Sequence, residues 1–414
     1  MTALSPPPPQ AEVATRLDAA VIGRQGSRFA GDMAARKADL RHAIADSRVL
    51  VVGACGSIGT TTVDALLEFQ PQETVLVDSN ENGLAEMMRD LRARDRAPAP
   101  MRVQAVPTDY GGPIMRRLLA GAKPFDLVLN FAAMKHVRSE KDLPSLLQIF
   151  ETNVVKHRRF LNWLAEGGHA ARRYFAVSTD KAANPTSLMG ASKRAMEELI
   201  FAGPWNFGAV SAARFANVAF SNGSVLASLV QRLALRQPLA VPKATKRYFV
   251  SIAEAGHICL LAAALGPHRH VVYPKLDPTV ELRLLEDVAR AVLAVYGLAA
   301  EIHDRESTAR AAVDGALARS HYPLLLTPLD TGGEKAFEEF LAEGEIAVEF
   351  GLAKLAAIPH RPWSFGIDAI VDPIAAAIED ASRPIDRKAI VAALQSVMPQ
   401  FRHVASDLTL DDRI

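Results

Sequence analysis

The stretch Arg48–Gly59, R-V-L-V-V-G-A-C-G-S-I-G, decides the fold predicted for this chain. The β-branched run before Gly53 is typical of a strand buried on both faces of a parallel sheet. Glycines at the first, fourth and seventh positions of Gly53–Gly59 allow a tight turn, a close approach to a pyrophosphate and close packing of the helix expected from Thr60. The amino end of that helix offers amide groups to phosphates. The stretch therefore predicts a dinucleotide-binding turn.

An acidic residue after the next strand indicates which dinucleotide binds. The strand expected at Glu73–Val77 is followed by Asp78, whose carboxylate would accept a hydrogen bond from a ribose 2′-hydroxyl and repel a 2′-phosphate, so NAD is favoured over NADP. Small residues after the strand Phe125–Phe131 would let the backbone approach a flat cofactor. The residues expected to contact NAD are Gly53, Gly56, Ser57, Ile58, Gly59, Asp78, Asp109, Ala132 and Ala133. For Asp109, contact with the adenine amino group and capping of the next helix are both open.

Strand and helix patterns alternate from Arg48 to Phe201 without repeats or linkers. This alternation predicts an α/β fold with a doubly wound parallel sheet (Rossmann) and a smaller C-terminal substrate-binding lobe. We expect a helical N-terminal extension (1–46, its first ten residues disordered), an NAD-binding domain (47–215), a substrate-binding lobe with elements returning to the core (216–345) and a C-terminal helical extension (346–414).

Composition narrows the class of protein. The 47 basic and 46 acidic residues nearly balance, so neither nucleic acid nor an anionic membrane is expected as a bulk partner. Two cysteines, Cys55 and Cys259, form no disulfide framework and suit a reducing compartment. No membrane span, signal peptide or metal site is expected, and we predict a cytoplasmic protein. The N-terminal extension is expected to pack on the core or on a second subunit of a homo-oligomer.

A second stretch, Val177–Lys193, reads V-S-T-D-K-A-A-N-P-T-S-L-M-G-A-S-K and follows another buried strand. Thr179, Asp180 and Lys181 would lie just past the carboxyl end of that strand, where open parallel sheets bind ligands. Met189 and Lys193 are four residues apart on the following helix and share one face. Together these groups suit proton transfer, although a charged surface loop would read the same way.

Further polar residues are expected around the same crevice. Lys135 and His136 follow the strand that ends at Phe131, and no role is assigned to His136. Asn217 and Ser224 lie in a loop that either binds sugar hydroxyls or a diphosphate, or only makes a turn. Arg247 stands beside Tyr248 and Phe249, which suits recognition of a phosphate and a base.

In this order the motifs resemble the extended short-chain dehydrogenase/reductases, and within them the CapD-like nucleotide-sugar 4,6-dehydratases of bacterial polysaccharide biosynthesis. The resemblance covers residues 46–270 and rests on Gly53–Gly59, Asn130–Val137, Thr179–Lys193, Arg214–Asn217 and Arg247–Phe249. It implies UDP-N-acetylglucosamine as substrate, a 4-keto-6-deoxy sugar as product and tightly held NAD.

The resemblance also implies a role for each site residue. Asp180 would be the acid that protonates the departing C6 hydroxyl, and Lys181 the base that removes the C5 proton. Thr179 would hydrogen-bond the C4 oxygen and Lys193 would hold the nicotinamide ribose; the substrate-binding residues would be Lys135, Asn217, Ser224 and Arg247, with Asn217 and Arg247 on the diphosphate. Because a lysine base must be neutral, we expect burial and the nearby Lys135 and Lys193 to lower the pKa of Lys181.

Two departures from the family pattern leave alternatives open. Met189 stands where most short-chain dehydrogenases have tyrosine, which marks a subgroup and leaves unassigned the group that deprotonates the C4 hydroxyl; Asp180 could serve both steps. Asn222 replaces an arginine, which leaves the sugar and nucleotide open. The alternatives to a dehydratase are a nucleotide-sugar 4-epimerase and a non-catalytic NAD-binding regulator.

Overall fold

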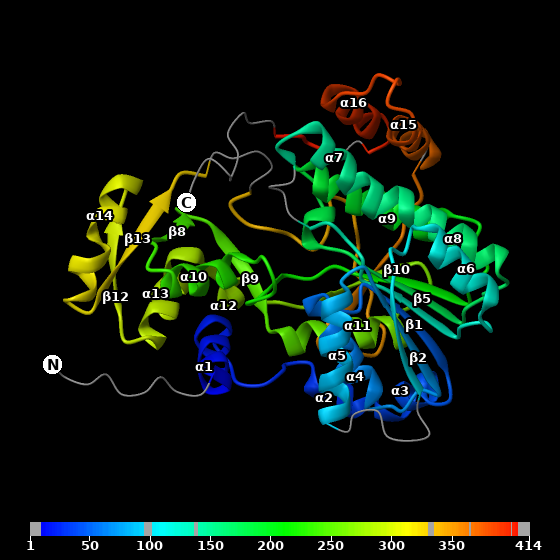
Figure 1. Cartoon of the computed structure of the whole chain (residues 1–414), viewed down its shortest axis with the longest axis horizontal. Coiled ribbons are helices and arrows are strands. Elements are labelled where there is room, and N and C mark those ends of the chain that lie inside the picture. Colours follow the sequence, from blue (N-terminus) through cyan, green and yellow to red (C-terminus); the bar gives the residue numbers. More distant parts are fainter. Residues whose placement is uncertain are drawn as a thin grey trace.

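An eight-stranded sheet, in the order β14-β10-β6-β5-β4-β1-β2-β3, forms the centre of the computed structural model (Figure 1). The structure describes residues 10–94, 102–135, 140–329, 335–363, 366–398 and 400–404, so His136 and Val137 lie outside it. The strands are β1 (Arg48–Val52), β2 (Glu73–Asp78), β3 (Arg102–Pro107), β4 (Leu127–Asn130), β5 (Arg173–Val177), β6 (Ala209–Ala213), β10 (His270–Pro274) and β14 (Leu355–Pro359). Neighbouring strands are parallel except β10 and β14. The predicted doubly wound sheet is confirmed.

The strand register aligns the carboxyl ends of the central strands. Val52 pairs with Val77 of β2 and with Asn130 of β4, and Asn130 pairs with Ala176 of β5. Val177 pairs in turn with Ala213 of β6. The loops that follow β1, β4, β5 and β6 therefore leave the same edge of the sheet, which brings together residues far apart in sequence.

Helices cover both faces of the sheet because its strands are apolar on both faces. Val49 and Val51 of β1 belong to the core that includes α4 and α11, whereas Leu50 and Val52 belong to the core on the opposite face. The first face carries α2 (Ala30–Ala35), α3 (Lys37–Ile44), α4 (Ser57–Leu67), α5 (Glu81–Ala93) and α11 (Ile252–Leu265); the second carries α6 (Pro113–Gly121), α7 (Leu143–Phe150), α8 (Lys156–Glu166) and α9 (Leu188–Ala202).

A smaller lobe, shown at the left of Figure 1, has its own core. Its strands form the sheets β11-β9-β7 and β12-β13-β8. Leu17 and Val21 of α1 (Gln10–Ile22) join this core, so the N-terminal helix packs on the lobe of its own chain. The lobe contains β7 (Asn217–Val218), α10 (Val225–Ala234), β8 (Leu239–Pro242), β9 (Lys246–Val250), α12 (Pro278–Glu281), β11 (Leu282–Leu284), α13 (Leu285–Val295), β12 (Ala299–His303), α14 (Glu306–Leu317) and β13 (His321–Thr327).

The region after residue 346 differs from the purely helical extension expected from sequence. Its strand β14 pairs antiparallel with β10 and forms one edge of the main sheet. The apolar run Leu355–Ile358 is short enough to be buried against β10, and all four residues are buried. Helices α15 (Asp368–Glu379) and α16 (Arg387–Val397) follow and lie outside α7 and α9. Within the described ranges, every helix is too short or too polar to traverse a lipid bilayer.

Candidate active site

The turn after β1 is built so tightly that two of its glycines are required. Gly53 has a φ of +73°, and a Cβ there would lie 2.6 Å from the Ala132 nitrogen. A Cβ on Gly59 would lie 2.3 Å from the Gly53 carbonyl oxygen. Helix α4 begins at Ser57, one turn earlier than the helix predicted from Thr60, and no described side chain caps its first amides. Those amides and the open backbone fit an anion such as a pyrophosphate.

The carboxylate of Asp78 lies against this glycine turn. Its Oδ2 accepts a hydrogen bond from the Cys55 amide at 2.9 Å, and its Oδ1 accepts one from the Asn80 amide at 2.9 Å. Burial, and then the charge of Asp78, raise the pKa of the Cys55 thiol to about 12, so the thiol stays protonated at neutral pH. The turn and the acid at the end of β2 together fit a dinucleotide with a free ribose 2′-hydroxyl.

The loop after β4 is held by buried amides. Asn130 Oδ1 accepts from the Ala132 amide at 3.0 Å, which fixes the backbone that faces Gly53. Asn153 clamps Met134: its Oδ1 accepts from the Met134 amide and its Nδ2 donates to the Met134 carbonyl, both at 2.9 Å. The same Nδ2 donates to Ser192 Oγ of α9 at 2.9 Å. Asn153 thus ties the β4 loop to the helix that carries Lys193.

The sequence pattern predicts one continuous helix over roughly residues 146–166, and nothing in that pattern singles out Asn153. The structure interrupts this helix with a π-helical turn, Glu151–Val155, between α7 and α8. Such turns are frequent at functional sites, where the extra residue changes the direction of a side chain. Hydrophobic periodicity contains no signal for a single turn of this kind.

The loop after β5 gathers the predicted acid and base in a 3₁₀ turn, Asp180–Ala182. Thr179 Oγ1 donates to Asp180 Oδ1 at 2.8 Å, and Lys181 Nζ lies 3.2 Å from the same oxygen. Asp180 is only 2% exposed, and its Oδ2 has no hydrogen-bond partner among the described residues. A buried carboxylate oxygen without a partner is costly, which marks this turn as a candidate site.

Glu338 is the residue of this site that sequence reasoning did not identify. Its Oε1 lies 3.5 Å from Lys181 Nζ and 4.0 Å from Arg247 Nη2, and its side chain is 4% exposed. It follows the lobe by sequence, and the sequence alone gives no reason for it to approach residue 181. Only the folded chain brings it there.

This arrangement corrects the expected protonation of Lys181. Burial by itself would lower the pKa of Lys181, but the carboxylates of Asp180 and Glu338 outweigh burial, so the pKa is raised. Arg247 opposes this effect; Lys135 and Lys193, which were expected to lower the pKa, are not among the charges that act on it. Lys181 is therefore an ammonium group paired with two carboxylates.

Helix α9 begins directly on this turn. Ser187 caps it by accepting a hydrogen bond from the Gly190 amide at 3.0 Å, and a Cβ on Gly190 would lie 2.6 Å from the Lys181 carbonyl oxygen. Glu140 Oε1 accepts from the Met189 amide at 2.8 Å. Met189 is 2% exposed and packs in the apolar core, so its side chain offers no proton-transfer group.

Burial lowers the pKa of two predicted site lysines, Lys135 and Lys193, and Lys193 is the more deeply buried of the two. It is 4% exposed, and its Nζ contacts Met196 Sδ at 3.2 Å. Burial lowers its pKa to about 8 although the charge of Glu197 opposes the shift. Lys193 also lowers the pKa of buried His157, after burial itself. A poised amine on α9 agrees with its expected place beside a cofactor ribose, which stays a prediction.

The remaining predicted residues make mainly local contacts. Ser224 caps α10 by accepting from the Ala227 amide at 3.2 Å, and Asn217 Nδ2 donates to the Tyr248 carbonyl at 3.3 Å. Asp109 accepts from the Gly111 amide at 2.9 Å and pairs with Lys156, an arrangement that agrees with a turn-closing role. Lys135 is exposed at the end of the β4 loop.

One contact joins the substrate loop to the cofactor turn. The Asn222 amide donates to Ser57 Oγ at 3.0 Å, so the loop after β7 lies beside the start of α4. Residues expected to meet a sugar nucleotide and residues expected to meet NAD therefore lie at one edge of the sheet.

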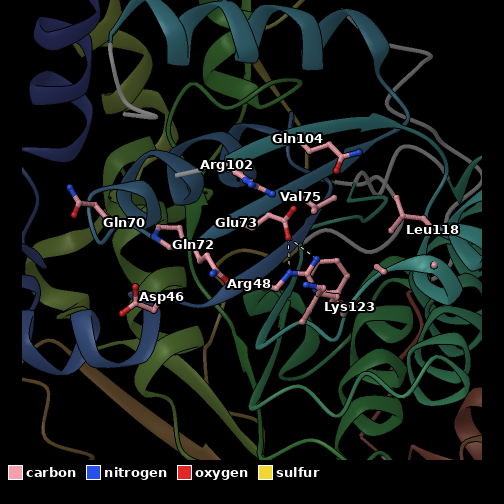
Figure 2. A pocket seen from close by; sticks show the side chains of 14 residues that line it. Asp46, Arg48, Gln70, Gln72, Glu73, Val75, Arg102, Gln104, Leu118 and Lys123 are labelled. Atoms are coloured by element: carbon pink, nitrogen blue, oxygen red, sulfur yellow. Dashed lines mark hydrogen bonds and ion pairs between the residues drawn. The ribbon is translucent and has the colours of Figure 1, made fainter. Parts of the chain in front are cut away.

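A cavity of about 890 Å³ lies at the opposite edge of the sheet (Figure 2). Arg48, Glu73 and Arg102, which line it, begin β1, β2 and β3. Arg48 pairs with Glu73 at 2.6 Å, and Figure 2 shows the two side chains facing each other. This cavity is remote from the strand carboxyl ends and contains none of the predicted site residues.

Known proteins of polysaccharide biosynthesis resemble this chain over the part that contains the main sheet and the lobe. Residues 49–359 match the family described as polysaccharide biosynthesis protein. The chain belongs to this family. The capsular polysaccharide biosynthesis protein CapD of Staphylococcus aureus is 28% identical over 61% of this chain and 41% of its own length. A UDP-N-acetylglucosamine 4,6-dehydratase (inverting) of Campylobacter jejuni is 27% identical over 50% of this chain and 60% of its own. The resemblance to CapD-like enzymes is thus confirmed, and the chain spans less than two thirds of these curated relatives.

Among solved structures, Pen from Bacillus thuringiensis superposes with a TM-score of 0.60 at 20% identity, over 76% of this chain and 88% of that one. At this identity the likeness supports the fold alone. The match includes most of the chain, which supports the α/β fold described above.

Proposed function

We propose that this protein is a nucleotide-sugar-modifying enzyme of polysaccharide biosynthesis that dehydrates a UDP-N-acetylhexosamine, with UDP-N-acetylglucosamine as the first candidate, to the 4-keto-6-deoxy sugar. The observation that carries the proposal is the buried Asp180–Lys181 pair, with its unpartnered carboxylate oxygen, at the same sheet edge as the glycine turn. Elimination of water needs one group to give a proton and another to take one. Two adjacent ionisable groups meet this need.

NAD is the proposed cofactor, and it supplies the reversible removal of hydride from the sugar. Gly53 and Gly59 would admit its pyrophosphate, because any Cβ there would close the turn. The Asp78 carboxylate would accept a hydrogen bond from the ribose 2′-hydroxyl and keep the one that it accepts from the Cys55 amide. Lys193 would lie against the nicotinamide ribose, and Ala132 and Ala133 would leave room for the ring.

Asp180 and Lys181 can reach the acid–base form without a change in total charge. Lys181 carries the proton before the reaction, because its pKa is raised by the carboxylates beside it. Transfer of that proton across the 3.2 Å contact gives a neutral acid and a neutral amine. Asp180 would then protonate the departing C6 hydroxyl, and Lys181 would accept the C5 proton, while Thr179 hydrogen-bonds the C4 oxygen. The proton taken from C5 is returned to C5 when hydride comes back to C6, and the proton that leaves with water is balanced by the one that the C4 hydroxyl loses on oxidation.

A nucleotide-sugar 4-epimerase on the same fold is the alternative, since it needs NAD and C4 oxidation but no acid for C6. An Asp180→Asn variant separates the two functions. It would lose dehydration if Asp180 is the acid, whereas an epimerase would retain activity. A non-catalytic regulator would turn over no nucleotide sugar at all.

Incubation with UDP-N-acetylglucosamine in deuterated water tests the proposal. Mass spectrometry is expected to show loss of one water, and NMR to show deuterium at C5 of the product, because the proton removed there exchanges on Lys181. The Asp180→Asn protein serves as the matched control. Recovery of unaltered UDP-, GDP- and dTDP-sugars would reject the enzyme assignment, and inversion at C4 alone would support the epimerase.

A further inference from the structure

Residues 335–345, here called the strap, connect the lobe to β14 and cross over the Asp180–Ala182 turn. Several buried or partly buried contacts fix the strap. Arg247 Nη1 donates to the Lys335 carbonyl at 2.9 Å, and Arg214 Nη1 donates to the Phe340 carbonyl at 2.9 Å. Arg214 also pairs with Glu345 at 2.6 Å. Because these anchors lie on both sides of Glu338, its position is determined by the fold and not by its own flexible side chain.

Glu338 itself points from the strap toward the base. It lies 3.5 Å from Lys181 Nζ and 4.0 Å from Arg247 Nη2 through one oxygen. The other oxygen, Oε2, is buried and finds no hydrogen-bond partner in the part of the chain that the structure describes. A buried carboxylate held this way is stabilised mainly by the two cations that face it, so its charge and theirs are coupled.

The charges of this cluster balance only when Glu338 is counted. Two cations, Lys181 and Arg247, face two carboxylates, Asp180 and Glu338. Without Glu338 the buried cluster would carry an excess positive charge, and the simplest way to lose it is release of the Lys181 proton. With Glu338 present, the charge of Arg247 is cancelled, and a proton can pass between Lys181 and Asp180 inside a neutral cluster.

We propose that Glu338 is a positioning residue of the Asp180–Lys181 site, which holds the Lys181 amine against Asp180 and sets the pH at which this amine loses its proton. Its effect on catalysis rests on the proposed function, but its effect on Lys181 does not. The strap thereby links the C-terminal part of the chain to the chemistry at the end of β5.

The test measures the protonation of Lys181 in the full chain without requiring turnover. Competitive labelling with acetic anhydride across a pH series, followed by peptide mass spectrometry, reports the titration midpoint of each lysine. In Glu338→Gln the midpoint of Lys181 is expected to fall by about one pH unit or more, because an opposite charge within 4 Å is removed. Lys123, far from the strap at the other sheet edge, is the internal reference and should not change.

The neighbouring Glu339→Gln is the matched control. Glu339 is exposed, and its carboxylate accepts from Asn184 Nδ2 at 3.0 Å, away from Lys181. This variant should leave the Lys181 midpoint unaltered. If Glu338→Gln fails to fold, Glu338→Asp keeps the charge but withdraws it by one methylene, and it should move the midpoint in the same direction by less.

Activity provides the second readout. The limb of the kcat/KM–pH profile that requires neutral Lys181 should move to lower pH in Glu338→Gln and stay in place in Glu339→Gln. A Lys181 midpoint equal to that of the unmodified protein, in either Glu338 variant, would overturn the proposal. Absence of turnover in every variant, with the labelling shift intact, would instead reject the proposed function and leave the positioning role standing.

Discussion

The two edges of the main sheet both carry clustered charges, but the clusters differ in how they meet water. At the amino edge Arg48 and Glu73 form an ion pair, with side chains 17% and 22% exposed, beside a cavity of about 890 Å³. At the carboxyl edge Asp180 and Glu338 are nearly inaccessible, and each has an oxygen without a partner among the described residues. The cavity at the amino edge is therefore not the place where charged side chains are most deeply buried.

Buried carboxylate oxygens without partners are therefore a better indicator of the candidate site than the volume of a cavity. Solvent screens the pair at the amino edge, so it contributes little to stability. At the carboxyl edge there is little water to compensate a lone oxygen, so each charge depends on its neighbours. Substitutions at the two edges should have very different effects.

The largest expected difference concerns activity. Lys181→Arg keeps the charge between Asp180 and Glu338, but a guanidinium does not give up its proton, so we expect a loss of about 10²- to 10⁴-fold in kcat. Lys123→Arg at the amino-edge cavity should stay within about twofold. The measurement is conversion of UDP-N-acetylglucosamine by variants whose thermal unfolding is unchanged. Equal activity of the two variants would remove Lys181 from the chemistry.

A second contrast concerns stability. Arg214 is fully buried between Glu197 and Glu345, each at 2.6 Å, so Arg214→Met should lower the free energy of unfolding by about 3–5 kcal/mol by leaving two buried carboxylates with Arg194 as their one shared cation among the described residues. Glu73→Gln, which removes the amino-edge charge pair and leaves the hydrogen bond from Arg48 to the Pro124 carbonyl in place, should cost about 1 kcal/mol or less. Urea unfolding compares them, and similar costs would show that the amino edge is as constrained as the carboxyl edge.

The smallest effect concerns pH. Burial lowers the pKa of Lys193 to about 8 from an ordinary 10.5. Above pH 10.5 the Lys193 amine is neutral in both the folded and the unfolded chain. Between pH 10.5 and 8 only the unfolded chain binds a proton there, so the free energy of unfolding falls as the pH falls. Below pH 8 both states bind the proton, and the lost stability stays constant. Relative to Lys193→Met, the unfolding free energy of the unmodified protein should fall by up to about 3 kcal/mol between pH 10.5 and 8.

Urea unfolding at a series of pH values provides the measurement for Lys193. Lys123→Met is the control for removal of an exposed lysine at the other edge, and it should run parallel to the unmodified protein. If the free energy of unfolding of Lys193→Met also changes with pH in parallel with that of the unmodified protein, the Lys193 amine is freely hydrated in the folded state.

Much of the sheet was predictable because its information is local. The β-branched runs of β1, β2 and β4, the glycine turn and Asp78 each carry their own periodicity or spacing, and their alternation with helices indicates a parallel sheet. The edge strand β14 was not predictable, because a short apolar run that follows a long irregular segment has no period of its own. Its partner β10 lies far away in sequence, and only pairing distinguishes it from a loop.

The same division applies to the candidate site. Thr179, Asp180 and Lys181 could be placed at a strand end from sequence, since parallel strands present their following loops at one edge. Their protonation could not, and the expected lowering of the Lys181 pKa was wrong because Glu338 arrives from the strap. Asn153 was hidden within a π-helical turn, where one inserted residue changes a side-chain direction without changing composition.

The sequence by itself determined a doubly wound sheet, a dinucleotide-type turn and an acid–lysine pair at a strand end, because each depends on residues close together in the chain. Only the tertiary structure decided that the pKa of Lys181 is raised while that of Lys193 is lowered. The pKa of an amine depends on every charge within a few ångströms, and for Lys181 one of those charges lies more than 150 residues away in the chain.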